Sequence, residues 1–333
     1  MAKLKVGVIG TGHLGKLHTK LFKEVNDCEL VGIYDKDFTQ LNKAANEFQV
    51  KAFKNESELI DAVDAISIVA TTSAHYSLAK LAFNKNKHVF IEKPITKDIW
   101  EAEDLVKIAD EKKLKLQVGH IERFNPALLS LEKYHLNPMF IQSDRLSQFN
   151  PRGTDVAVVL DLMIHDIDII LSLIQSEVKD VSASGVAVVS DSLDIANARI
   201  EFENGAVANV TASRISQKKM RKMRMFQRDT YITLDFTTGT SEVYRLVSPD
   251  EIPKNSFINF GDIGIGDKKK SVIYEQPEQK EVNALKYELQ LFIDSIHKNI
   301  APPVTGADGL KALRVAEKII SRIEESIKDA KNN

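Results

Sequence analysis

The stretch LKVGVIGTGHLGK, residues 4–16, decides how the rest of the chain is interpreted. Val6, Val8 and Ile9 form a short apolar run ended by glycine, which is typical of a strand buried on both faces of a parallel sheet. The glycines that follow have the spacing G-x-G-x-x-G, and an amphipathic segment comes next. A strand, a glycine-rich turn and a helix in this order predict a dinucleotide-binding site.

Each glycine of this turn has a separate expected role. Gly10 permits the tight turn, Gly12 leaves room for a pyrophosphate against the backbone, and Gly15 lets the helix pack close to the strand. The backbone N–H groups of His13 and Leu14 are expected to face the phosphates, where the helix dipole favours negative charge.

Asp35 lies at the end of the second expected strand, where the ribose-binding acid of such a site belongs. A carboxylate there accepts hydrogen bonds from the ribose hydroxyls and repels a 2′-phosphate, so NAD is expected in preference to NADP. Lys36 follows immediately and softens that preference. The alternative is an acid on a surface turn without a ligand.

Size, charge and cysteine content narrow the class of protein. A chain of 333 residues predicts two domains, and its apolar fraction of 43% is enough for real cores. The net charge of −2 gives no reason to expect nucleic-acid or membrane binding. Cys28 is the only cysteine, which excludes an internal disulfide and fits a reducing compartment. The chain starts close to its first strand, so we expect a cytoplasmic protein without a signal peptide.

The first 120 residues alternate strands and helices, which predicts a doubly wound parallel sheet of the Rossmann type, an α/β architecture. After the first strand, further strands are expected at 30–34, 51–53, 65–70, 88–91 and 115–118, with helices at 38–48, 73–83 and 99–112. We place residues 1–120 in an NAD-binding domain and residues 121–333 in a substrate-binding and oligomerisation domain.

The second domain is expected to be α+β, with a large, mostly antiparallel open sheet, because its strands follow one another without helices between them. Asn204-Gly205 predicts a hairpin turn. Strands are expected at 178–189, 195–203, 206–213, 220–227, 231–236 and 242–246, a loop at 252–270, and helices covering one sheet face at 156–174, 284–297 and 309–327.

Glu92, Lys93 and Pro94 follow what is counted here as the fifth strand, at the edge where open α/β sheets bind ligands. A lysine at this edge reaches the nicotinamide and a substrate hydroxyl, and the proline helps to fix the backbone after it. The alternative is an exposed loop lysine without a role.

The stretch VAVVLDLMIHDIDIILSLI, residues 156–174, is apolar almost all round and is expected to be deeply buried. Within it Asp161, His165 and Asp168 are spaced i, i+4 and i+7, which places them on one helix face. An Asp one turn from a His orients the ring and tunes its basicity, as a general base requires. The alternative is a structural buried histidine. The chain has no cysteine cluster and no H-E-x-x-H, so no metal site is expected.

With these motifs in view, the sequence resembles the glucose–fructose oxidoreductase/inositol dehydrogenase (Gfo/Idh/MocA) family along nearly its full length. The stretches that carry the resemblance are GVIGTGHLG, residues 71–75, IEKP, GHIERFNP and DLMIHDID. The resemblance implies dehydrogenation of sugars or cyclitols and a homodimer or homotetramer formed through the open sheet. Lys93, Asp161 and His165 match the catalytic positions of the family.

The resemblance also implies a set of ligand contacts. Thr71, Thr72, His75 and Glu92 join Lys93 as expected cofactor contacts, although Thr72 stands where the family usually has proline, which alters the nicotinamide loop.

The stretches GHIERFNPA and FNPRGTDVAVVLDLMIHDIDI look like the branch that oxidises UDP-N-acetylglucosamine at C3. Arg123, Asn125 and Arg152 are therefore candidate substrate contacts, as is His165. An arginine suits a diphosphate because its planar fork donates two hydrogen bonds. Solvated surface arginines are the alternative.

Together these patterns predict an NAD-dependent dehydrogenase that oxidises a ring hydroxyl of a nucleotide sugar. His165 is the expected base, Lys93 stabilises the developing charge on oxygen, and Asp161 holds the imidazole. One alternative is a free-sugar or inositol dehydrogenase of the same family. Another is a non-catalytic sensor that binds the cofactor or sugar, which would not need all three of these side chains.

Overall fold

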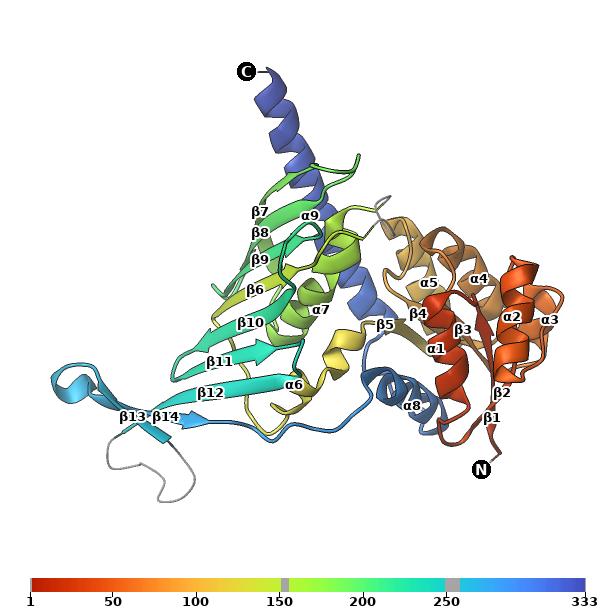
Figure 1. The fold of residues 1–333 in the computed structure, drawn as a ribbon, viewed down its shortest axis with the longest axis horizontal. Coiled ribbons are helices and arrows are strands. Elements are labelled where there is room, and N and C mark those ends of the chain that lie inside the picture. The colour runs from red at the N-terminus through yellow and green to blue at the C-terminus, as the bar shows by residue number, and fades with distance from the viewer. Residues whose placement is uncertain (1, 151–155, 249–257, 333) are drawn as a thin grey trace. The chain divides into compact units, whose positions relative to one another are not determined.

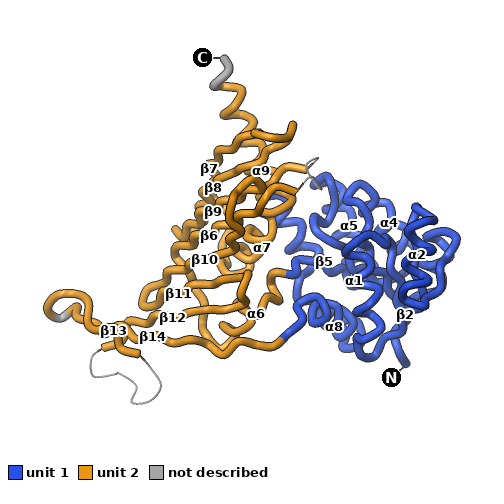
Figure 2. The backbone as a smooth tube through the Cα atoms, in the orientation of Figure 1, with its two compact units in different colours: residues 1–121, 282–314 blue, residues 122–281, 315–333 orange. Residues whose placement is uncertain are grey.

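The computed structural model describes residues 2–150, 156–248 and 258–332. Its contacts divide the chain into two compact units (Figure 2). Unit 1 comprises residues 1–121 and 282–314, and unit 2 comprises residues 122–281 and 315–333. A single boundary at residue 120 does not account for the return of residues 282–314 to the first unit.

Unit 1 is built on a five-stranded parallel sheet with the order β2-β1-β3-β4-β5 (Figure 1). The strands are β1 Leu4–Ile9, β2 Cys28–Tyr34, β3 Ala65–Ile68, β4 His88–Glu92 and β5 Leu116–Gly119. This confirms the doubly wound parallel sheet. The strand expected at 51–53 is wrong, because that segment makes only an isolated bridge between Ile33 and Ala52. Glu92 therefore ends the fourth strand of the chain, not the fifth.

Helices cover the parallel sheet. They are α1 His13–Phe22, α2 Phe38–Phe48, α3 Glu56–Asp61, α4 Thr72–Asn84, α5 Ile99–Lys112 and α8 Ala284–His297. The buried Leu289 and Phe292 of α8 share one core with Phe22 of α1 and Phe90 of β4. The expectation that residues 284–297 cover the antiparallel sheet is therefore wrong, because the apolar side of α8 completes the core of unit 1.

Unit 2 contains a nine-stranded sheet with the order β13-β14-β12-β11-β10-β6-β9-β8-β7 (Figure 1). Its strands are β6 Phe140–Leu146, β7 Val178–Val186, β8 Ile195–Phe202, β9 Val207–Ser213, β10 Met220–Gln227, β11 Thr230–Asp235, β12 Thr240–Val247, β13 Ile258–Ile263 and β14 Lys270–Glu275. Among the described strands of this sheet, only β6 and β9 pair in parallel. The expected mostly antiparallel sheet is confirmed, and Gly205, with φ of +85°, lies in the turn between β8 and β9.

Three strands of this sheet are additional to the expected ones. The central β6 points Ser143 and Arg145 into the core, so it lacks the alternation of apolar and polar residues by which strands are recognised. The loop expected at 252–270 is wrong for its described part, which contains β13. Every residue of β13 is exposed, so its sequence carries no burial pattern. β14 follows it and pairs with both β13 and β12.

Unit 2 also contains helical segments, the first of which starts at the boundary with unit 1. They are the 3-10 turns Ile121–Phe124 and Gly266–Lys268, α6 Pro126–Leu129, a π-helical turn Val159–Met163, α7 Ile164–Leu173, and the C-terminal part of α9 Gly306–Asn332. α7 packs on β6 and β9. The single α-helix expected at 156–174 is thus a π turn followed by α7, and π turns are frequent at functional sites. Across the described residues no helix combines the length and apolar character needed to cross a bilayer.

Candidate functional site

The glycine turn between β1 and α1 has the geometry that a nucleotide-binding turn requires. Gly10 has φ of +99°, and a Cβ there would lie 2.5 Å from the Val69 carbonyl oxygen. A Cβ on Gly15 would lie 1.9 Å from the Gly10 carbonyl oxygen, so α1 starts in direct contact with the turn. A Cβ on Gly12 would meet no atom within 4 Å. The backbone of Gly12 is therefore open to a ligand, next to the exposed His13 and Leu14 that begin α1.

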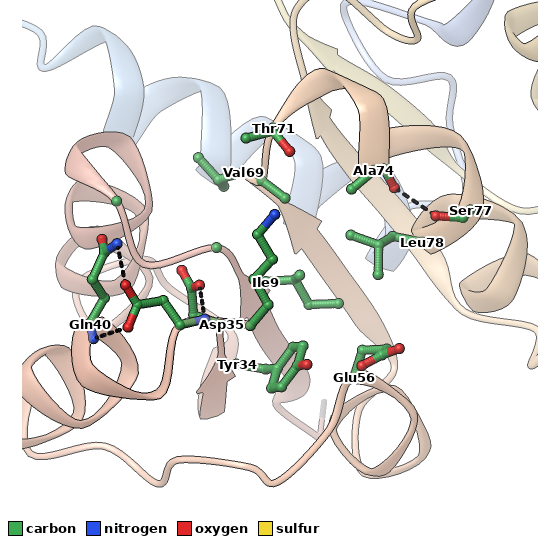
Figure 3. A pocket seen from close by; sticks show the side chains of 15 residues that line it. Ile9, Tyr34, Asp35, Gln40, Glu56, Val69, Thr71, Ala74, Ser77 and Leu78 are labelled. Atoms are coloured by element: carbon green, nitrogen blue, oxygen red, sulfur yellow. Dashed lines mark hydrogen bonds between the residues drawn. The ribbon is translucent and has the colours of Figure 1, made fainter.

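A cavity of about 580 Å³ opens beside this turn (Figure 3). Such a volume is ordinary for a small-molecule or cofactor site. Of the residues expected at the cofactor, five line the cavity: Gly10, Gly12, Asp35, Lys36 and Thr71. Ile9, Val69 and Leu78 supply an apolar wall, and Tyr34 and Glu56 lie at one end of the cavity.

Asp35 ties the end of β2 to the glycine turn. Its Oδ2 accepts hydrogen bonds from the Thr11 backbone N–H at 2.6 Å and the Thr11 hydroxyl at 2.9 Å. Its Oδ1 accepts from the Asp37 backbone N–H at 2.9 Å. These contacts hold an ionised carboxylate in the cavity wall, where it has further lone pairs for ribose hydroxyls.

A second carboxylate lies two residues further on. Asp37 begins α2 by accepting hydrogen bonds from the backbone N–H groups of Thr39 and Gln40. The Gln40 side-chain amide and these N–H groups lower the pKa of Asp37. Asp35 and Asp37 together give this part of the cavity a negative charge, which disfavours a 2′-phosphate, and Lys36 between them opposes that effect.

Residues 93–95 form a turn at the carboxyl end of β4, the Lys93 turn. The side chains of Glu92 and Lys93 are half-buried, and the Lys93–Pro94 peptide bond is cis. His75 is 1% exposed, and its Nδ1 and Nε2 lie 3.0 and 3.1 Å from the carbonyl oxygens of Pro94 and Ala70. Both ring nitrogens therefore face the backbone, and burial lowers the pKa of His75. This arrangement makes His75 a support for the turn, and its expected contact with the cofactor stays a prediction. Thr72 is the half-buried first residue of α4.

Asp161 and His165 are half-buried and lie on the π turn and the first turn of α7. Asp168, the third member of the expected polar stripe, is 1% exposed and forms a two-pronged ion pair with Arg123. The Arg123 Nε and Nη2 each donate to one Asp168 oxygen at 2.7 Å. Asp168 thus belongs to a buried ion pair that fixes α7, whereas Asp161 and His165 are the half-buried members of the stripe.

A second buried group of charged side chains fixes the same helix to the sheet. Arg145 of β6 donates through Nε to Asp166 of α7 at 2.6 Å and through Nη1 to Glu122 at 2.9 Å. The Ser143 hydroxyl also donates to Asp166, at 2.9 Å. Burial opposes the charge of Arg145, but the two carboxylates outweigh it and raise its pKa. Removing one member of such a group leaves a buried unpaired charge, so these residues hold α7 in place.

The segment just before the π turn is fixed by a third group of buried residues. Arg214 donates to the carbonyl oxygens of Val156 at 2.6 Å and Leu193 at 2.7 Å. Its Nε lies 3.2 Å from Asp194, which is fully buried. The start of the segment that carries Asp161 and His165 is therefore held by side chains far away in sequence, which the motif analysis did not identify.

The expected substrate contacts have different surroundings. Arg123 is 15% exposed and paired with Asp168, so it is not a solvated surface arginine. Asn125 begins α6 and donates from its amide to Glu122 and to the Phe236 carbonyl oxygen, each at 3.1 Å. Arg152 lies outside the described residues.

Two protein-family profiles match this chain, over separate stretches of the sequence. The profile described as "Oxidoreductase family, NAD-binding Rossmann fold" matches residues 4–120. The profile described as "GFO/IDH/MocA C-terminal domain" matches residues 134–241.

Curated relatives and solved structures are similar over most of the chain. UDP-N-acetylglucosamine 3-dehydrogenase from Acidithiobacillus ferrooxidans is 40% identical over 245 residues, which cover 73% of this chain and 78% of that protein. A solved structure of that dehydrogenase has a TM-score of 0.86 at 33% identity and covers 98% of this chain and 99% of its own. Myo-inositol 2-dehydrogenase from Thermotoga maritima is 25% identical over 341 residues, covering 97% of each protein. These matches confirm the resemblance inferred from the motifs.

Proposed function

This chain belongs to the Gfo/Idh/MocA oxidoreductase family and is a sugar dehydrogenase, and we propose that it oxidises a nucleotide sugar, with UDP-N-acetylglucosamine at C3 as the first candidate. The observation that carries this proposal is the relative of that activity, at 40% identity over 73% of the chain. The cavity beside the glycine turn, with its open Gly12 backbone and its carboxylates, supports NAD as the cofactor.

The residues present fit NAD at the level of its phosphates and ribose. The N–H groups that begin α1 would bind the pyrophosphate, and Asp35 would accept hydrogen bonds from the ribose hydroxyls. Bound NAD supplies an acceptor for the hydride that leaves the sugar carbon. The adjacent carboxylates Asp35 and Asp37 support a preference for NAD over NADP.

We assign the proton chemistry to His165, Asp161 and Lys93. His165 would take the proton from the reacting hydroxyl as the C–H hydride leaves, so that the alcohol becomes a ketone and the ring becomes an imidazolium. Asp161, one helical turn before it, would orient and stabilise that ring. The Lys93 ammonium would donate a hydrogen bond to the sugar oxygen while negative charge develops on it.

An inositol dehydrogenase is the second candidate, because the Thermotoga maritima relative is similar to this chain over 97% of the length of each protein. Such an enzyme needs no contact to a nucleotide diphosphate. The two candidates separate in a panel of UDP-N-acetylglucosamine, other UDP-sugars, N-acetylglucosamine and inositols, each tested with NAD and with NADP by the absorbance of the reduced cofactor. Turnover of inositols but not of UDP-sugars would overturn the first proposal.

Substitutions test the assigned residues in the same assay. His165→Ala is expected to lower kcat by about 10²–10⁴-fold, because it removes the proton acceptor. Lys93→Ala should also lower kcat strongly, and neither variant should weaken NAD binding more than about 3-fold, because neither residue belongs to the glycine turn. The exposed His135 and Lys97 provide matched alanine controls that should keep wild-type turnover. Wild-type kcat in His165→Ala would refute its role as the base.

A further inference from the structure

The Lys93 turn is supported from two sides by buried histidines that are far away in sequence. His75 of α4 faces the carbonyl oxygen of Pro94, on one side of Lys93. His18 of α1 faces the carboxylate of Glu92, on the other side, at 3.2 Å. Pairing of the ring with Glu92 connects the helix of the nucleotide turn to the strand end that carries Lys93.

His18 is fully buried and has polar partners on both ring nitrogens. Its Nδ1 lies 2.9 Å from the hydroxyl of Ser67, which is itself fully buried in β3. Its ring also makes an edge contact with Phe90 of β4, with the ring centroids 5.4 Å apart. A polar ring in such a position costs free energy unless its hydrogen bonds are made, so its orientation is tightly specified.

The chemistry of the three polar groups assigns the protons. An ionised Glu92 can only accept, so the Nε2 of His18 carries the hydrogen that it shares with this carboxylate. In the neutral ring Nδ1 then accepts from the Ser67 hydroxyl. All polar positions of the ring are satisfied in this state, and the ring points one donor at Glu92.

Glu92, whose carboxylate faces His18, also contacts the backbone of Lys93. Its second oxygen, Oε2, lies 3.3 Å from the backbone N–H of Lys93. The carboxylate also packs against Gly119, where a Cβ would lie only 2.7 Å from Oε1. The carboxylate is therefore held between His18, the backbone of β5 and the first peptide group of the lysine turn.

We propose that His18 is a positioning residue that sets the reactivity of Lys93 by holding Glu92 at the start of the turn. This inference rests on the proposed role of Lys93 as the group that stabilises the sugar oxygen. Displacement of a catalytic group by about 1 Å can lower a rate by about 10²-fold, so loss of the His18–Glu92 contact should appear in kcat.

Two substitutions at the same position separate positioning from packing. His18→Phe keeps an aromatic ring against Phe90 but removes the donor to Glu92, and we expect kcat to fall by about 10–100-fold. His18→Gln retains an N–H donor of similar reach and should recover kcat to within about 5-fold of the wild type. Both variants should bind NAD within about 3-fold of the wild type in calorimetric titrations, because the glycine turn is unchanged.

His88 provides a matched control, because it lies at the opposite end of β4 from Glu92. His88 begins β4, and its Nδ1 accepts a hydrogen bond from the Lys115 backbone N–H at 2.9 Å. His88→Phe removes one histidine hydrogen bond from this strand, as His18→Phe does, but away from Lys93. It should leave kcat within about 2-fold of the wild type.

A second readout does not depend on the substrate. The rate at which a small amine-acylating reagent modifies Lys93 in the protein with NAD bound is measured by peptide mass spectrometry. We expect His18→Phe to change this rate at Lys93 by about 3-fold or more and to leave the rate at the exposed Lys97 unchanged. If His18→Phe folds poorly, Ser67→Ala loosens the same ring without removing it and should change the rate in the same direction.

A double-mutant cycle with Lys93→Ala decides between positioning and a general loss of structure. If His18 acts through Lys93, His18→Phe should have almost no further effect on kcat in the Lys93→Ala background. An equal fold-loss in both backgrounds, or unchanged labelling of Lys93 in His18→Phe, would overturn the inference. Should Lys93→Ala keep wild-type turnover, the proposed role of Lys93 fails, and the labelling rate alone then decides whether His18 controls this lysine.

Discussion

Adding one methyl group at either Gly12 or Gly15 is expected to damage this enzyme in two separable ways. Both glycines belong to the same turn and would receive the same side chain. Their surroundings differ, because a Cβ on Gly15 would lie 1.9 Å from the Gly10 carbonyl oxygen, whereas a Cβ on Gly12 would meet nothing within 4 Å. The pair therefore separates the turn's role in folding from its role in binding.

The loss in the free energy of unfolding expected for Gly15→Ala follows from the overlap of its Cβ with the Gly10 carbonyl oxygen. Non-bonded heavy atoms approach to about 3.5 Å, so α1 would have to move by roughly 1.5 Å to accommodate the methyl group. That movement also displaces the buried Leu21 and Phe22 from the core of unit 1. Overpacking typically costs about 1–3 kcal/mol, and the added disturbance of the core places the expected loss near 3 kcal/mol.

The cost of Gly12→Ala appears only when the cofactor binds. Gly12 has φ of −65° and ψ of −164°, an extended conformation open to any residue. The free energy of unfolding should therefore change by no more than about 0.5 kcal/mol. The methyl group would keep the pyrophosphate away from the backbone N–H groups, and hydrogen bonds to a charged group contribute about 1.5–3 kcal/mol. NAD affinity should fall by about 10–100-fold.

Urea unfolding and calorimetric titration with NAD measure the two effects on the same samples. Gly15→Ala should lower the midpoint of unfolding clearly, whereas Gly12→Ala should unfold as the wild type does and bind NAD weakly. The reasoning is refuted if Gly12→Ala binds NAD with wild-type affinity, or if Gly15→Ala is as stable as the wild type.

Three further predictions concern cofactor choice, acid stability and assembly. Asp35→Ser should narrow the preference for NAD over NADP in titrations, and a wild type that binds NADP more tightly would refute the assignment of Asp35. Burial opposes ionisation of Asp194, but N–H groups from Val189, Val188 and Ser190 and the Ser190 hydroxyl lower its pKa from 3.8 to about 2. Because the pKa of Asp194 is lower in the folded than in the unfolded chain, its ionised form should add about 2 kcal/mol to the free energy of unfolding above pH 4. This contribution should be lost as the pH falls towards 2. Asp194→Asn should therefore flatten the pH dependence of urea unfolding in that range. The sheet of unit 2 exposes Phe226 on the face opposite α7, and we expect a second copy of the chain to cover this face. Light scattering should therefore report a homodimer or homotetramer. A monomer at micromolar concentration would contradict pairing through this face.

Local patterns in the sequence determined the parallel sheet and the nucleotide turn. The helices expected at 38–48 and 99–112 have these bounds in the structure, because apolar spacing and the residues at helix ends act over a few positions. Asp35 and Lys93 could likewise be placed, because parallel strands all end at one edge of the sheet. Each of these inferences depends on neighbours that are close in sequence.

Only the tertiary structure decided which distant side chains meet. His18 lies 49 positions from Ser67 and 74 positions from Glu92, so no local pattern identifies it as a support for Lys93. Arg145 makes β6 difficult to recognise as a central strand, because its inward charge is satisfied by Asp166 of a helix 21 positions away. A buried polar group is stable only with its partner, and that partner is supplied by the folded chain, not by the neighbouring sequence.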